Sequence, residues 1–344
     1  MLRGMLLRFT GVIAAALFAG AAQAEPLRAT GPFVHDNLAI YFIHGDSARD
    51  EAPLTLHEAM KSGVAQVHET GDVNELKIEV NGDREVFVQS GNLMKGGKQD
   101  RILTSSLIVT PGSGSIPIES LSVEEGRRWP RGSEGEASFT GTEFLVPSKG
   151  AKLAMKSDFP VQVAGMAVIN DAARPSRQVQ LWQSVAATQE NLKDTLGRSV
   201  TETISRSSLP LSLENATLKE RQNRYVKALD RLPQDETIIG YAFAVNGRLN
   251  SADVYASQAL FAKMWSKLLR ASATEAIAER GRLGDAVPAP DAVDAFLADA
   301  KSVPAKLRPL SADVRLETRE TEQVVYSETQ RTSGVGVHRN YVAK

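Results

Sequence analysis

The residues best suited to chemistry lie in two short stretches, and the first of them, SGNLMKGGKQDR, carries two adjacent glycines. Adjacent glycines let backbone N–H groups converge on one point, which favours the binding of an anion. The ammonium group of Lys98, the amide of Gln99 and the guanidinium group of Arg101 would add donors to the same point. Together with Gly96 and Gly97, they predict a small-anion site in the connection between two strands.

The second stretch, VEEGRRW, brings a carboxylate, two guanidinium groups and an indole close together. Glu124 could accept a hydrogen bond from a ribose hydroxyl or bind a cation, and Trp129 could stack on a base. Arg127 would add a further donor for an anion. The alternative is a long turn with a solvated charge cluster, in which the indole covers the edge of the core. If the strands between the two stretches pair antiparallel, Arg101 and Glu124 face each other and both stretches form one site.

The common catalytic and metal-binding motifs are absent from the sequence. His57 and Glu58 begin a zincin-like pattern, but position 61 is a lysine instead of the second histidine, so we predict no metal site. The Gly-x-Ser-x-Gly elbow, the Walker motif and the dinucleotide fingerprint are missing, which disfavours serine hydrolases, P-loop proteins and Rossmann enzymes. We interpret each of the five histidines, His338 included, as a surface or hydrogen-bonded residue. The sequence therefore identifies no reaction, no catalytic residue and no cofactor.

The composition excludes several classes of protein. The 344 residues contain 40 Lys and Arg against 41 Asp and Glu, which gives a net charge of −1. Proteins that bind nucleic acid usually carry a basic excess, so we expect no nucleic-acid partner. The chain has no cysteine, which rules out disulfides, cysteine nucleophiles and iron–sulfur clusters.

Residues 1–24 predict a secretory signal peptide. Arg3 and Arg8 form a basic start, residues 12–18 form an apolar core, and residues 22–24 read AQA, a small-x-small cleavage site. The apolar stretch is shorter than the roughly 20 residues that a membrane-spanning helix needs. We therefore expect a periplasmic or secreted protein with no stable membrane span after cleavage.

The two stretches lie in a strand-rich segment that we expect over residues 25–172. Alternating or continuous apolar residues predict strands, and one run with helical spacing predicts a short helix. Residues 126–142 lack periodicity and predict a loop. The predicted strands span 38–43, 64–69, 76–80, 85–88, 102–110 and 116–123, with 76–80 and 85–88 paired as a hairpin, and the helix spans 54–62.

A mainly helical half is expected over residues 173–305, followed by edge strands or a tail over 306–344. Asn246 and Gly247 predict the turn of a β-hairpin within the helical half. The fold class is therefore α+β, with an N-terminal mixed, largely antiparallel sheet before the helical half. Apolar helical faces place Trp182 and Trp265 in the core, whereas Trp129 should be at least partly exposed. The predicted helices span 174–196, with Val179, Trp182, Ala186, Leu192 and Leu196 on the apolar face, then 213–232, a helix capped by Ser257, and 291–300.

Several motifs in this order resemble the ARG and Rhodanese-Phosphatase-superfamily-associated Protein domain family. They are TLHEA followed by a glycine, a glycine-rich stretch ending in GKQDR, VEEGR with a tryptophan, and GYAFAVNG followed by FAKMWSKLL. The resemblance covers roughly residues 35–275. The chain departs from the family pattern at Asn92, Asp100 and Ser122, where the family usually has Glu, Asn and Cys.

The resemblance implies association with ADP-ribosylglycohydrolase and phosphatase-like proteins, and it carries no assigned reaction. We expect an exported domain that binds a small anionic, nucleotide-like ligand, with its protein partner and any enzymatic activity not identified. The alternative is a non-catalytic periplasmic interaction or structural module whose polar motif is a buried hydrogen-bond network. The candidate ligand-binding residues are Gly96, Gly97, Lys98, Gln99, Arg101, Glu124, Arg127 and Trp129.

Overall fold

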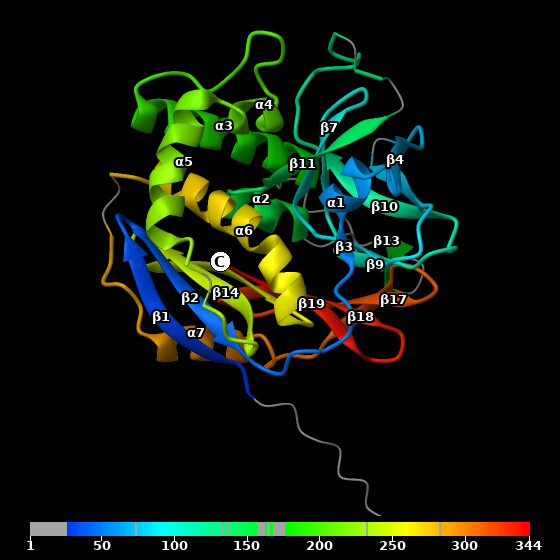
Figure 1. The fold of residues 1–344 in the computed structure, drawn as a ribbon. Coiled ribbons are helices and arrows are strands. Elements are labelled where there is room, and N and C mark those ends of the chain that lie inside the picture. Colours follow the sequence, from blue (N-terminus) through cyan, green and yellow to red (C-terminus); the bar gives the residue numbers. More distant parts are fainter. Residues whose placement is uncertain are drawn as a thin grey trace, which may run out of the picture.

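The computed structural model describes residues 26–344 apart from residues 73, 133, 136–137, 157–161, 164–165, 168–175, 232 and 282–283. The predicted signal peptide lies outside the described residues. The described elements confirm an α+β fold (Figure 1). The helices are α1 (Leu56–Lys61), α2 (Lys149–Lys156), α3 (Arg177–Leu196), α4 (Leu209–Leu213), α5 (Ala216–Leu229), α6 (Gln258–Ala278) and α7 (Pro290–Asp299). The strands are β1 (Arg28–His35), β2 (Leu38–His44), β3 (Leu54–Thr55), β4 (Ala65–Glu69), β5 (Glu75–Val80), β6 (Val86–Val88), β7 (Asn92–Gly96), β8 (Arg101–Leu103), β9 (Leu107–Val109), β10 (Ser115–Ser122), β11 (Phe139–Leu145), β12 (Gln162–Val163), β13 (Met166–Ala167), β14 (Ile238–Val245), β15 (Arg248–Tyr255), β16 (Lys306–Pro309), β17 (Val314–Glu320), β18 (Val324–Arg331) and β19 (Gly336–Ala343).

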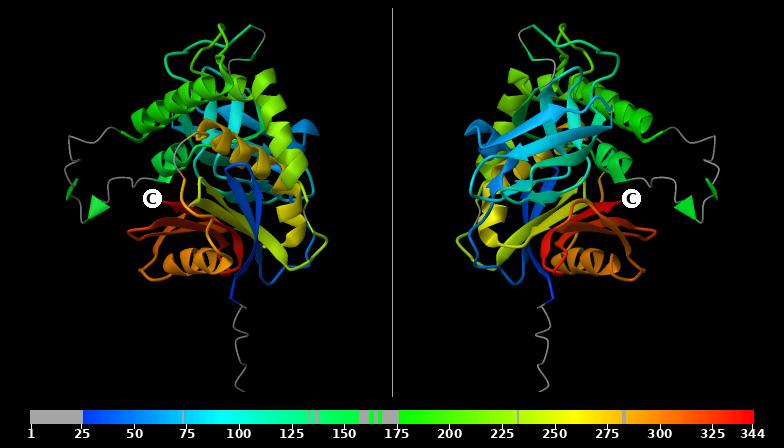
Figure 2. Two further views of the ribbon diagram at one scale, coloured as in Figure 1. Left: turned by 90° about the vertical axis from the view of Figure 1, so that its left-hand side faces the viewer. Right: turned by 90° about the vertical axis from the view of Figure 1, so that its right-hand side faces the viewer.

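The largest sheet has eight strands in the order β1-β2-β14-β15-β19-β18-β17-β16, and all its pairs are antiparallel. Its central strands β2 and β14 are nearly continuous apolar runs, as expected for strands that are covered on both faces. Phe42 of β2 packs in a core with α6, whereas its neighbours Tyr41 and Ile43 pack in a second core with Phe296 of α7. Figure 2 shows α7 on the side of this sheet that faces away from the smaller sheets.

A second, six-stranded sheet has the order β11-β7-β8-β10-β5-β4, and β3, β6 and β9 form a three-stranded sheet beside it. The predicted antiparallel return is confirmed, because β8 pairs with β10 and Arg101 lies opposite Ser122. The predicted hairpin of residues 76–88 is wrong, because β5 pairs with β4 and β10 while β6 pairs with β3 and β9. The two segments are separated by bends at residues 82–84 and continue into different sheets.

The second half of the chain is not mainly helical, which corrects the predicted fold. β14 and β15 form the expected hairpin, with Asn246 and Gly247 at positive φ in its turn. Within residues 306–344, β16 to β19 supply half of the eight-stranded sheet. Their weak apolar alternation concealed this role, because partly polar strands such as β17 are only half buried. Across the part of the chain that the structure describes, no helix is long and apolar enough to cross a membrane.

Helix α3 buries a different face from the predicted one. Its buried residues include Thr188 and Gln189, whereas Val179 is 36% exposed and Trp182 is only partly buried. Gln189 can be buried because its amide donates to Ser212 Oγ at 2.9 Å. A hydrophobic pattern cannot reveal such a polar core position. The other tryptophans lie as predicted, because Trp265 is buried and Trp129 is 75% exposed.

Candidate functional site

The predicted anion site is occupied by a carboxylate of the chain itself. Gly96 and Gly97 both have positive φ, as the two-glycine connection requires. The Gly96 N–H donates to Asp100 Oδ1 at 3.0 Å, and the Gly97 N–H donates to the Ser138 carbonyl at 3.1 Å. Arg127 then donates to the Gly97 carbonyl at 2.9 Å and to the Gly96 carbonyl at 3.1 Å.

Asp100 is fully buried and is neutralised by Arg131. The guanidinium group contacts both carboxylate oxygens, at 2.5 Å to Oδ1 and 2.9 Å to Oδ2. Ser208, the N-cap of α4, donates to Asp100 Oδ2 at 2.5 Å. Burial by itself would lower the pKa of Arg131, but the hydrogen bonds to Asp100 and Glu134 raise it above its ordinary value. We call Asp100, Glu124, Arg127, Arg131 and Ser208 the Asp100 network.

Glu124 is the second buried acid of this network. It accepts from the Asp100 N–H at 2.9 Å, and its carboxylate lies 2.7 Å from Arg127 Nε and 3.5 Å from Arg131. Ser205 also donates to this carboxylate. Arg101, the expected partner of Glu124, instead forms an ion pair with Glu69 at 3.5 Å.

The remaining predicted site residues lie outside this network. Lys98 is exposed, Gln99 is partly buried, and the Trp129 indole is 75% exposed while its carbonyl accepts from Arg127 at 2.7 Å. The first stretch and the second stretch are therefore brought together, but chiefly through Asp100 and Arg131, which the sequence analysis did not propose. Because acids, guanidinium groups and hydroxyls pair with one another here, the arrangement suits a scaffold that fixes loops.

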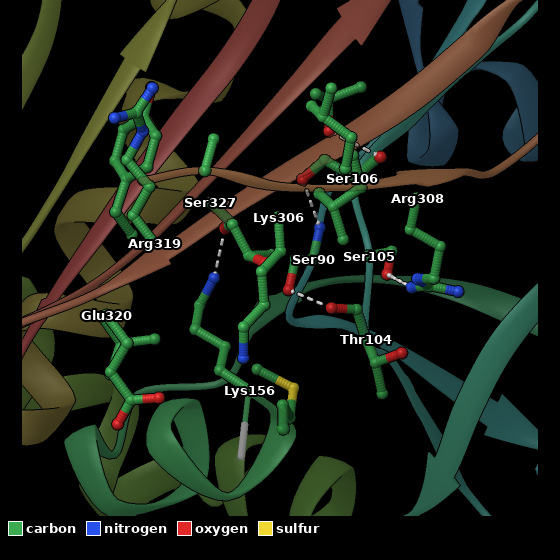
Figure 3. Close-up of a pocket in the computed structure, with 18 of the residues that line it drawn as sticks. Ser90, Thr104, Ser105, Ser106, Lys156, Lys306, Arg308, Arg319, Glu320 and Ser327 are labelled. Atoms are coloured by element: carbon green, nitrogen blue, oxygen red, sulfur yellow. Dashed lines mark hydrogen bonds between the residues drawn. The ribbon is translucent and has the colours of Figure 1, made fainter. Parts of the chain in front are cut away.

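A cavity of about 1270 Å³ lies elsewhere, between the β16–β18 end of the large sheet and the connection from β8 to β9 (Figure 3). The end of α2 forms a further part of its wall through Met155 and Lys156. Hydroxyl groups from Ser90, Thr104 and Ser105 line the opposite side.

Lys156 is the cavity cation with the most unusual environment. Its Nζ donates to Ser327 Oγ at 2.5 Å (Figure 3). Burial lowers its pKa to about 8, a shift that Asp253 opposes and Lys152 reinforces. By contrast, Arg308 at the cavity wall is paired with Glu119 at 2.6 Å.

A serine, a histidine and an aspartate are linked in series at the inner wall of the cavity. Ser106 Oγ lies 3.0 Å from His338 Nδ1, and His338 Nε2 lies 3.0 Å from Asp253 Oδ1. All three residues are at most 4% exposed, yet Ser106 and His338 line the cavity. We call Ser106, His338 and Asp253 the Ser106 relay.

The large sheet positions the acid and the base of the relay. β15 and β19 pair with Tyr255 opposite His338 and Asp253 opposite Asn340, so these four side chains share one face. The His338 ring packs against Tyr255, with ring centroids 4.7 Å apart. Asp253 Oδ1 also accepts from Asn340 at 2.8 Å and from Gln89 at 3.4 Å.

These donors control the charge of Asp253. Burial would raise its pKa, but the hydrogen bond from His338, supported by the charge of Lys152 and the hydrogen bond from Asn340, lowers it below the ordinary value. The carboxylate is therefore ionised at neutral pH and acts only as an acceptor. Among the described residues, no cluster of three or more His, Cys, Asp or Glu side chains could hold a metal ion.

The sequence analysis missed the Ser106 relay. Ser106 has no elbow motif around it, and 232 residues separate it from His338. One usable signal was Asp253 in the buried part of β15, because aspartate is depleted from strands.

Comparison with known proteins gives one match. A family model, described as the ARG and Rhodanese-Phosphatase-superfamily-associated Protein domain, matches residues 26–342. No curated protein and no solved structure matches the chain.

Proposed function

The chain belongs to the ARG and Rhodanese-Phosphatase-superfamily-associated Protein domain family, and from this premise we propose that it binds a small anionic ligand in the cavity beside Lys156. The glycine-rich connection is not part of this proposal, because its Gly96 N–H already donates to Asp100 and its Gly97 N–H to the Ser138 carbonyl. The observation that carries the proposal is the Lys156 ammonium group, which reaches a large cavity and donates to a neutral serine hydroxyl there.

The size of the cavity is suited to a small molecule. Its volume of about 1270 Å³ is at or above the upper end of the roughly 300–1,000 Å³ of most ligand sites. A nucleotide or a sugar phosphate would fit such a space. The hydroxyl oxygens of Ser90 and Thr104 line this space and can accept hydrogen bonds from a ribose.

The charge of the described cavity lining favours an anion. Glu119 and Glu320 are held by Arg308 and Lys344, at 2.6 and 2.7 Å. Lys156 adds a positive charge to these matched pairs, and a charge-assisted hydrogen bond to an anion is stronger than one between neutral groups. The described basic residues that line the cavity are Lys156, Arg177, Lys306, Arg308, Arg319 and Lys344, and the acidic ones are Glu119, Glu320 and Glu322.

A direct test compares wild type with Lys156→Met for binding of ADP-ribose, AMP, ribose 5-phosphate and inorganic phosphate. We expect at least one organic phosphate to raise the melting temperature, and calorimetry to show at least tenfold weaker binding by Lys156→Met, since hydrogen bonds to charged groups contribute about 1.5–3 kcal/mol. Lys193→Met is the matched control, because Lys193 pairs with Glu190 on an exposed part of α3. Equal affinities of wild type and Lys156→Met, or no binding of any of these compounds, would refute the proposal.

A second candidate function, that of an interaction or structural module, is favoured by the Asp100 network alone. Its buried acids and guanidinium groups are paired with one another, as expected for the alternative from the sequence. If this second function is correct, neither wild type nor Lys156→Met binds any of these compounds. Disruption of the Asp100 network would then unfold the protein.

Export is the remaining part of the proposed function. We propose that residues 1–24 are removed and that the mature protein acts in the periplasm or outside the cell, on the evidence of the basic start, apolar core and AQA site. Intact-mass measurement of exported protein should find Glu25 as the first residue. Retention of Met1 in a membrane fraction would contradict export.

A further inference from the structure

We propose that Ser106 is a nucleophile for acyl transfer, with His338 as its base, and that the substrates are carboxylic esters that carry an anionic group. The anionic group of the substrate rests on the proposed function. The nucleophile rests on the Ser106 relay itself, which stands whether or not Lys156 binds an anion.

The hydrogen bonds of the relay have the polarity that nucleophile activation needs. Asp253 accepts from His338 Nε2 at 3.0 Å, which places the ring proton on Nε2 and leaves Nδ1 as an acceptor. His338 Nδ1 is then free to accept the Ser106 hydroxyl proton across 3.0 Å. A nucleophile, a base and an orienting carboxylate thus occur in the order that defines catalytic triads, although the two ring nitrogens have exchanged their usual roles.

The position of Ser106 is fixed from two sides. Thr329 Oγ1 donates to the Ser106 carbonyl at 2.7 Å, which ties the connection between β8 and β9 to β18. The Ser90 N–H donates to Ser106 Oγ at 2.9 Å (Figure 3). This backbone donor fixes the orientation of the Ser106 hydroxyl beside His338.

A polar cluster with only a structural role does not need to border a cavity, whereas the Ser106 relay does border one. Ser106 and His338 line the same 1270 Å³ cavity as Lys156. A substrate whose anionic group pairs with Lys156 would therefore occupy the cavity that the nucleophile borders. A serine nucleophile, a histidine base and an orienting carboxylate are the groups that acyl transfer from an ester uses.

The reaction balances with water as the only co-reactant. Ser106 Oγ forms a bond to the ester carbonyl carbon while its proton moves to His338 Nδ1. The bond between that carbon and the alcohol oxygen then breaks, and His338 returns the proton to the leaving alcohol. Water next attacks the acyl-serine, His338 accepts a water proton and gives it to Ser106 Oγ, and the carboxylic acid is released.

The first test uses a fluorophosphonate probe on the mature protein, with peptide mass spectrometry to locate the adduct. We expect Ser106 to be labelled, labelling to be lost in Ser106→Ala, and its rate to fall at least tenfold in His338→Gln and Asp253→Asn. Ser105→Ala is the matched control, because Ser105 lines the same cavity but contacts Glu119 and Arg308 instead of the relay. Circular dichroism and melting temperature verify that each variant is folded.

The second test exploits the absence of cysteine from the chain. Ser106→Cys and Ser105→Cys each introduce a single thiol, which iodoacetamide alkylates as the thiolate. We expect Ser106→Cys to react at pH 7 at least tenfold faster than Ser105→Cys, and this advantage to disappear when His338→Gln is added. If the Ser106 hydroxyl had only a structural role, Ser106→Cys would not react faster than Ser105→Cys.

The outcomes separate this inference from the proposed function. The assignment of Ser106 as a nucleophile would be overturned if the probe forms no adduct on Ser106 and the two thiols are alkylated at equal rates. Anion binding by Ser106→Ala would remain intact in that case. If Ser106 forms an adduct but no organic phosphate binds, Ser106 is still assigned as a nucleophile. The requirement for an anionic group on its substrate would then be withdrawn. Hydrolysis of 4-nitrophenyl succinate in preference to the neutral 4-nitrophenyl acetate, lost in Lys156→Met, would support the full inference.

Discussion

The Asp100 network and the Ser106 relay are both buried polar clusters, but their charges are compensated in different ways. In the network, the buried carboxylates of Asp100 and Glu124 meet the guanidinium groups of Arg127 and Arg131, which also pair with the partly exposed Glu134, and Ser208 donates to Asp100. In the relay, one carboxylate meets a histidine and neutral amides, while Lys156 nearby has a pKa lowered to about 8. The network is closed on itself, whereas the relay borders a cavity.

This difference shows that burial and hydrogen bonding do not identify a functional cluster by themselves. Both clusters are conspicuous by those two criteria. In a cluster of paired acids and bases, the removal of one partner leaves an uncompensated buried charge. A cluster whose charges are not fully paired and that borders a cavity can still bind a ligand or transfer a proton.

The largest effect should follow from Arg131→Met in the Asp100 network. The change leaves two buried carboxylates with one guanidinium group fewer, and breaking a buried pair from one side costs about 3–5 kcal/mol. Urea unfolding measures this loss. Arg224→Met, which removes an exposed ion pair with Glu220, should leave the free energy of unfolding unchanged within error. A small loss in Arg131→Met would mean that the network is not the scaffold that we describe.

The second prediction concerns the pH dependence of anion binding by Lys156. The affinity should change about tenfold, which is a smaller free-energy effect than that of Arg131→Met. Its pKa of about 8 means that the ammonium form dominates at pH 7 and is the minor form at pH 9. ADP-ribose keeps its charge over this interval, so its binding should weaken about tenfold as the pH rises. Isothermal calorimetry from pH 7 to pH 9 tests this expectation.

Lys156→Arg is the control for this titration, because a guanidinium group stays protonated throughout the interval. The variant should bind with little dependence on pH. A flat pH profile in the wild type would show that Lys156 does not carry the binding, and the contrast between the two clusters would then rest on the relay alone.

The sequence predicts local structure well where short-range signals suffice. Ser257 caps α6 through the Leu260 N–H as expected, and the Asn246–Gly247 turn forms the β14–β15 hairpin. Long-range pairing lies beyond such signals. Nothing in the apolar run of β2 specifies β14 as its neighbour, and the weak alternation of residues 313–342 does not reveal half of a sheet.

The same limit applies to the sites. The sequence identifies the glycines and Glu124, which the fold does bring together, because they lie close in the chain. Arg131 lies in a loop without a motif, and its contact with Ser208 spans 77 residues. The Ser106 relay joins segments from three parts of the chain, so only the assembled sheets bring its members within hydrogen-bond distance.

The place of β2 in the large sheet has a consequence for how the protein is made. β2 lies between β1 and β14, and the side chains of His44 and Thr237, at the edge of this pairing, are 193 residues apart in the chain. Until β14 has been synthesised, the run LAIYFI can pair with β1 but has no second neighbour. Folds dominated by such distant pairings form slowly and leave apolar strand edges open to aggregation. The apolar edge of β2 is therefore open to contacts with other chains until β14 joins the sheet.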